Sequence, residues 1–234
     1  MTADVNNPAF HNKAYSSPGL RGQSGFSLVE LMLCLVITLV MLGVAVMVFS
    51  SALGTRAREA SKTDAIVAAQ AALNIMSREI GNAGYGLDTN GLGYRDINGN
   101  YVTDCTQKRL HFRANSVNTA NSTLTDSLGE DVTFFYDVDS QSVVRYDPAA
   151  STPGTSGVIN RVSDVNFTYY NYTFNALTGT VDVASATTPA ANTARVNVKL
   201  TVILGEVQGQ PTNQSVTISS DVNLRNSPFM LSQY

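Results

Sequence analysis

Glu30 is the residue whose position most clearly suggests a chemical role. It is the last charged residue before an uncharged run that covers residues 31–49. At about 1.5 Å of rise per residue, this run would form roughly 28 Å of helix, close to the thickness of the hydrocarbon layer of a bilayer. A carboxylate at the edge of such a segment is costly unless it has a partner or a function. The alternative is that Glu30 only marks the boundary between the membrane interface and the apolar layer.

The residues before this run resemble the processing site of type IV prepilins. The sequence G-F-S-L-V-E occupies residues 25–30, and Arg21 lies shortly upstream. In that family a membrane-embedded peptidase cuts after the glycine, the new N-terminal residue is usually an N-methylated phenylalanine, and a glutamate lies four residues beyond it. The resemblance implies cleavage between Gly25 and Phe26 by prepilin peptidase, N-methylation of Phe26, and an assembly role for Glu30.

Electrostatics gives this arrangement a physical reason. A glutamate and a free α-amino group near an apolar phase are each costly alone and much less costly as an ion pair. Glu30 lies about one helical turn from Phe26, so it could neutralise the amine of its own chain or that of a neighbouring subunit. The resemblance favours the neighbour, whose amine would draw an incoming subunit into register.

The chain around this motif divides into four predicted parts. Residues 1–25 are polar and contain prolines and glycines, and the resemblance makes them the leader peptide. Residues 26–52 form the predicted transmembrane and assembly helix, which crosses the membrane in contact with lipid. Residues 53–84 continue that helix with an amphipathic face, and residues 85–234 form a periplasmic β-sheet domain with long loops. The helical face is expected from a spacing of three and four residues between Ile66, Ala69, Leu73, Met76 and Ile80.

Beyond the helix the periodicity of apolar residues changes to two, which is typical of strands. We expect loops at 147–160 and 175–194, where alanine, threonine, serine, glycine and proline accumulate. The fold class is therefore α+β and pilin-like, with a long N-terminal helix packed on an antiparallel sheet, mainly through the apolar face of residues 195–204. The predicted strands are 109–114, 131–136, 142–146, 164–172, 195–204 and 215–224.

Two further segments resemble PilW-like minor pilins, which are related to minor pseudopilins of type II secretion. They are R-E-I-G-N-A-G-Y at residues 78–85 and D-V-N-L-R-N at residues 221–226. The resemblance implies that the partners are other minor and major pilins and the inner-membrane platform for pilus assembly. It places the precursor in the bacterial inner membrane, with the leader in the cytoplasm and the C-terminal domain in the periplasm, before it enters a pilus or pseudopilus.

One loop carries oxygen ligands at alternating positions. Asp96, Asn98, Asn100 and Asp104 suit calcium, but the glycine stands at the fourth place of the run and no glutamate follows at the twelfth. A turn at Asn98-Gly99 between two short strands explains the same residues. The turn is the stronger interpretation, and the cation site is a weak candidate.

Other chemistry is sparse in this sequence. His111 is expected at the surface, between Arg109 and Arg113, and Cys34 and Cys105 cannot pair because one lies in the span and the other in the outer domain. We find no nucleophile elbow, no phosphate-binding loop and no zinc spacing, so neither a catalytic site nor a cofactor is predicted. A net charge of −3 with 14% charged residues gives no basic surface for nucleic acid.

These observations favour a non-enzymatic minor pilin that helps to prime type IV pilus assembly and enters the filament at or near its tip. The nearest alternative is a minor pseudopilin of a type II secretion system, which shares the same anchor. A pilus-tip adhesin is a second alternative, supported only by the long loops rich in tyrosine, asparagine and threonine. A membrane-tethered enzyme has no catalytic residues behind it.

Overall fold

The computed structural model describes residues 25–87, 91–95, 98–117, 127–151, 154–207 and 211–232. It separates into two compact units, Met1–Ser50 and Ser51–Tyr234, and the division falls within the long helix. The predicted leader lies outside the described residues, except for Gly25.

The described part of the first unit is the start of one continuous helix. Helix α1 runs over Leu28–Ile80, so it begins two residues after the expected start at residue 26 and ends four residues before the expected end at residue 84. Every residue from 25 to 50 is exposed, although almost all of those in the helix are apolar. A helix that is apolar all round needs either a protein core or a membrane to cover it. By length and composition, α1 is the one helix among the described residues that could cross a membrane.

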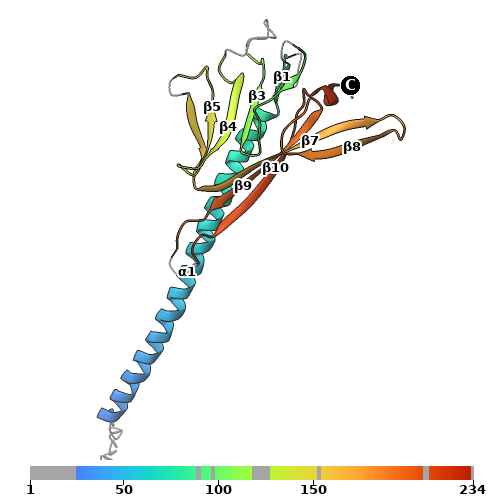
Figure 1. Cartoon of the computed structure of the whole chain (residues 1–234). Coiled ribbons are helices and arrows are strands. Elements are labelled where there is room, and N and C mark those ends of the chain that lie inside the picture. Colours follow the sequence, from blue (N-terminus) through green and yellow to red (C-terminus); the bar gives the residue numbers. More distant parts are fainter. Residues whose placement is uncertain are drawn as a thin grey trace, which may run out of the picture. The chain divides into compact units, whose positions relative to one another are not determined.

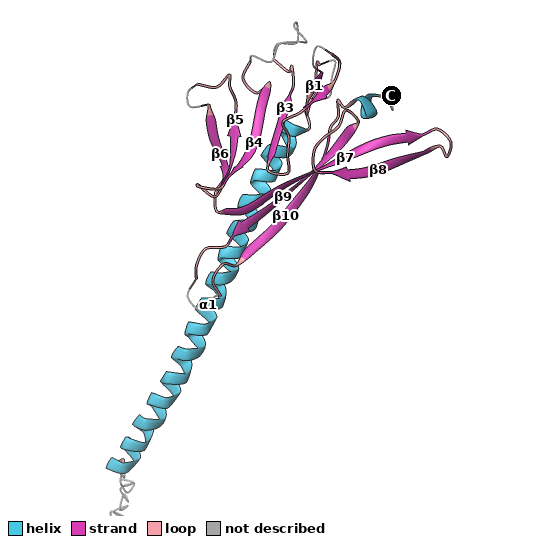
Figure 2. Ribbon diagram, viewed as in Figure 1, coloured by secondary structure: helices cyan, strands magenta, loops and turns pink. Residues whose placement is uncertain are grey.

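The second unit combines the rest of α1 with two antiparallel four-stranded sheets (Figures 1 and 2). The first sheet has the order β10-β9-β7-β8, the second has the order β3-β4-β5-β6, and β1 and β2 form a separate small ribbon. A short helix, α2, lies near the C-terminus. The bounds are β1 Tyr94–Arg95, β2 Tyr101–Val102, β3 Arg109–Arg113, β4 Asp131–Asp137, β5 Ser142–Tyr146, β6 Thr155–Ile159, β7 Val162–Asn175, β8 Thr180–Ala186, β9 Thr193–Ile203, β10 Ser215–Asn223 and α2 Pro228–Leu231.

One hydrophobic core joins the helix to both sheets. The predicted inner face of β9 is confirmed, because Val196, Val198, Leu200 and Val202 are buried in the same cluster as the helix residues. The buried line of α1 differs slightly from the expected one, since it starts at Ala65 while Ile66 is only half-buried. Small side chains allow the sheet to lie close to the helix axis, which explains this shift. The buried helix residues are Ala65, Ala69, Ala72, Leu73, Met76 and Ile80.

Two predicted loops are in part strands. The expected loop 147–160 contains β6, which pairs with β5, and the expected loop 175–194 contains β8, which pairs with residues 169–175 of β7. Both strands lie at sheet edges and expose most of their residues, so they contain no buried run that would mark them in the sequence. Backbone pairing with a neighbouring strand, rather than side-chain pattern, defines them.

The end of α1 packs against the segment that follows β10. Asn226 donates from Nδ2 to the carbonyl oxygen of Ala83 at 3.5 Å. Gly84 has a φ of +82°, and a Cβ there would lie 3.1 Å from the carbonyl oxygen of Asn226. A side chain at this position would therefore be strained by both backbone geometry and space. The two segments singled out at residues 78–85 and 221–226 thus meet in the folded domain.

The burial of α1 gives a matched stability test within one helix. Ile80 is completely buried, whereas Ile75 is 45% exposed. We expect Ile80→Ala to lower the free energy of unfolding of the second unit by about 2–5 kcal/mol, because it leaves a cavity. Ile75→Ala should cost less than about 1 kcal/mol. The free energy of unfolding of each variant is measured by urea titration of the full chain in detergent, with the circular dichroism of the tyrosines as the signal. Equal losses of free energy in the two variants would contradict this packing.

Candidate functional site

The N-terminal motif lies at the exposed start of α1. The first backbone hydrogen bond of the helix runs from the amide of Leu31 to the carbonyl oxygen of Ser27, at 3.0 Å. Glu30 is therefore in the first helical turn, where the positive end of the helix dipole stabilises a carboxylate. Its side chain is exposed, and Phe26 is 80% exposed. Glu30 and Phe26 are therefore both accessible to another molecule.

The fold itself does not require glycine at position 25. A Cβ placed on Gly25 would meet no atom within 4 Å, and its φ lies outside the left-handed region that favours glycine. Any requirement for glycine here must therefore come from a second protein that binds this segment. An enzyme that cuts the chain after Gly25 would impose such a requirement.

Comparison with known proteins addresses this same segment. A model described as the prokaryotic N-terminal methylation motif matches residues 20–46. The chain carries a prepilin-like methylation motif. The match supports a type IV pilin-like or pseudopilin-like protein that is processed by prepilin peptidase, assembles with other pilins and is anchored in the inner membrane. The motif is typical of structural proteins rather than enzymes.

We found no match among curated proteins or among solved structures. The matched residues end within α1, so they do not include either segment that resembles PilW-like proteins.

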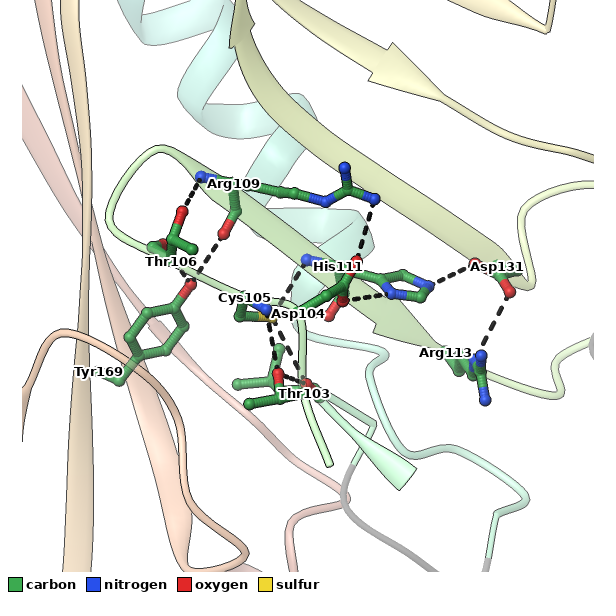
Figure 3. Close-up of polar contacts among 10 residues, drawn as sticks. Thr103, Asp104, Cys105, Thr106, Arg109, His111, Arg113, Asp131 and Tyr169 are labelled. Carbon is green, nitrogen blue, oxygen red and sulfur yellow. Dashed lines mark hydrogen bonds and ion pairs between the residues drawn. The ribbon is translucent and has the colours of Figure 1, made fainter. Parts of the chain in front are cut away.

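A second polar site lies where the β1–β2 ribbon meets β3 and β4 (Figure 3). His111 Nδ1 lies 2.7 Å from Asp104 Oδ1, and its Nε2 lies 2.6 Å from Asp131 Oδ1. Arg109 contacts the other oxygen of Asp104 at 3.0 Å, and Arg113 lies 3.5 Å from Asp131. The side chain of His111 is only 19% exposed. The expected surface position of His111 is only partly right, because two carboxylates from different segments flank the ring.

The two carboxylates decide the charge of this histidine. Burial alone would lower the pKa of His111, but hydrogen bonds to Asp131 and Asp104, together with their negative charges, raise it above its ordinary value of 6.5. Burial likewise would raise the pKa of Asp104, and the hydrogen bond and charge of His111 hold it below its ordinary value. Both ring nitrogens face carboxylate oxygens, so neither is open to act as a general base. The arrangement can hold the segment 103–106 against β3 and β4.

The weak calcium candidate falls partly outside the described residues. Asp96 is not described, and Asn98 and Asn100 are exposed on the turn that joins β1 and β2. The turn interpretation is confirmed, since Gly99 has a φ of +82° between these two strands. Asp104 is directed at His111 and Arg109 instead. Within the described ranges, no group of three or more His, Cys, Asp or Glu residues could hold a metal ion.

Cys105 is a buried, unpaired thiol beside the histidine, as expected. Its Sγ accepts a hydrogen bond from the amide of His111 at 3.2 Å and donates to the carbonyl oxygen of that residue at 3.1 Å. Burial raises the pKa of the thiol, which makes it less reactive. Tyr169 of β7 donates to the carbonyl oxygen of Thr106 at 2.9 Å, so the same segment is also fixed to the first sheet (Figure 3). Cys34 is unpaired too.

Sequence reasoning missed one ion-pair network that joins α1 to the second sheet. Arg145 of β5 lies 2.8 Å from Glu79 of the helix and 3.0 Å from Asp147, whose side chain is completely buried. The pKa of Arg145 is raised, because its bonds to Glu79 and Asp147 outweigh the effect of burial. Asp147 also accepts a hydrogen bond from the amide of Gly129 at 2.8 Å. No spacing in the sequence indicates a contact between residues so far apart along the chain.

The histidine cluster predicts a pH-dependent contribution to stability. Because the folded pKa of His111 is raised, its stabilisation is fully present below about pH 6.5 and is lost as the pH rises through the folded value. We expect His111→Gln to lower the free energy of unfolding by about 2 kcal/mol at pH 5.5 and by less at pH 8.5. The reference is the wild-type chain, unfolded at the same two pH values. An equal loss at both pH values would contradict the raised pKa.

Proposed function

We propose that this protein is a minor pilin that helps to prime type IV pilus assembly and is incorporated at or near the filament tip. The observation that carries the proposal is the methylation motif at the start of an uncovered apolar helix. Prepilin peptidase cuts between Gly25 and Phe26, and the Phe26 amine is then N-methylated. The leader lies in the cytoplasm and the β-sheet domain in the periplasm.

In this proposal, Glu30 is the group that selects the position of the next subunit. Its carboxylate accepts the Phe26 ammonium group of a neighbouring chain within the apolar layer. Breaking such a pair by removing one partner typically costs about 3–5 kcal/mol away from water, far more than the same pair contributes at an exposed surface. A subunit that is shifted along the helix axis leaves both charges unpaired. The pair therefore fixes the register in which helices stack.

The PilW-like segments support a minor rather than a major pilin. In sequence they are 130 or more residues apart, yet Asn226 contacts the backbone of both Asn82 and Ala83. Their resemblance therefore applies to one structural feature, the junction between the helix end and the segment after the last strand. This junction belongs to the folded domain and not to the membrane anchor that all such proteins share.

A minor pseudopilin of a type II secretion system is the second candidate, because the methylation motif serves both assemblies equally. Deleting the gene for this protein in its native cell distinguishes the minor pilin from the minor pseudopilin. Loss of surface pili with normal protein secretion favours the pilus. Retained pili with loss of proteins from the culture medium favours the secretion system. Normal piliation with loss of surface attachment would favour the tip adhesin instead.

Glu30→Gln tests the assembly role with little change in side-chain shape. We expect this variant to be processed at Gly25 but to fall at least about tenfold in the filament fraction sheared from cells, because a neighbouring ammonium group loses its partner. Glu59→Gln is the matched control, since Glu59 lies on an exposed part of the same helix. Immunoblots of the sheared and membrane fractions measure the distribution. Wild-type incorporation of the Glu30 variant would contradict the role.

A further inference from the structure

The outer part of the β7–β8 hairpin extends past the rest of its sheet (Figures 1 and 2). The pairing of β9 with β7 ends at Asn171, whereas β8 pairs with β7 from Tyr169 to Asn175. Beyond Asn171 the sheet is therefore reduced to two strands. A two-stranded ribbon in water is only marginally stable, and additional strands are what usually stabilise it.

β8 also offers a free edge along its whole length. It is the last strand of its sheet, and six of its seven residues are exposed. One row of its backbone N–H and C=O groups therefore has no strand partner among the described residues. Such an edge is a template for pairing with another strand.

The devices that usually block an edge strand are missing from β8. Its pairing with β7 has no register shift, it contains neither proline nor lysine, and Asp182 is its only charged residue. One edge strand of the other sheet, β6, is different. The pairing of β6 with β5 has a register shift at Val143 and Val144. A bulge of this kind twists an edge away from incoming strands.

The side chains indicate what kind of strand would fit. Val181 lies opposite Phe174 and Val183 lies opposite Tyr172, so these four side chains share one face of the ribbon. Val181 and Val183 are 41% and 49% exposed, and Phe174 is 61% exposed. The opposite face carries Asp182 and its cross-strand partner Thr173. A matching strand is thus extended, nearly uncharged and apolar at alternating positions.

We propose that β8 pairs antiparallel with β8 of a second copy of this chain, with the two-fold axis at Val183. β8 itself is nearly uncharged and carries apolar side chains at alternating positions, so it meets the requirements for a matching strand. A two-fold axis at Val183, the middle residue of Thr180–Ala186, pairs all seven residues of the strand. In this register Val183 faces its own copy, Val181 faces Ser185, and Asp182 faces Ala184. No like charges meet, and the two ribbons become one four-stranded sheet.

This contact joins two copies and no more, because an isologous interface uses the same surface on both partners. It does not depend on the methylation motif or on Glu30. A failure of the contact would therefore leave the proposed function untouched, and the reverse also holds.

Cysteine cross-linking of the full chain in its native membranes tests the contact. In a Cys34→Ala background, we expect Val183→Cys to form, under mild oxidation, a product of twice the chain mass on non-reducing gels. Val138→Cys is the matched control, because Val138 is 68% exposed in the turn between β4 and β5. It should give less than a tenth of that product. No product from Val183→Cys, equal products from both positions, or a product of another mass would overturn the proposal.

Two further variants test the register and the partner. Val181→Cys and Ser185→Cys chains, expressed together, should cross-link more strongly with each other than either does with itself. Val183→Lys should abolish the association because two ammonium groups would meet on the axis, and mixing it with Val183→Glu should restore it. These outcomes require a second copy. Association of Val183→Lys at the wild-type level would overturn the two-fold pairing.

Discussion

The uncovered apolar surface of the first unit is the constraint on which the rest of this protein depends. Every residue from 25 to 50 is exposed. Each aliphatic or aromatic side chain left in water costs about 1.5–3 kcal/mol relative to burial, so this part of α1 needs a bilayer or the helices of other subunits. In the proposed function, Glu30 and the Phe26 amine that processing would free lie at the entrance to that apolar environment, so their pairing would matter far more there than on a wet surface.

The same helix has a different task in the second unit. There it presents a narrow line of alanines with Leu73, Met76 and Ile80, against which both sheets form one core. The ion pair of Arg145 with Glu79 adds a polar connection near the end of the helix. In the proposed function, processing and assembly take place at one end of α1, while the other end supports the folded domain.

Sequence patterns predicted the features that depend on local periodicity and missed those that depend on distant pairing. The helix limits, six strands and the Asn98-Gly99 turn follow from spacing and turn chemistry. β6 and β8 were missed because they lie at sheet edges and are mostly exposed, so backbone bonds with neighbouring strands define them. The enclosure of His111 was missed because Asp104 and Asp131 come from separate segments that only the sheet brings together. The motif at residues 25–30 was found because its residues are adjacent in the chain.

The most direct test of the central claim is the intact mass and N-terminal sequence of the protein extracted from its native membranes. The account predicts a chain that begins with N-methylated Phe26. It also predicts that a Gly25→Ile variant keeps its leader, because the structure leaves room for a side chain there and only the peptidase requires glycine. A wild-type chain that keeps Met1, or that begins at any residue other than Phe26, would contradict the account. In that case residues 31–49 would be an ordinary membrane anchor.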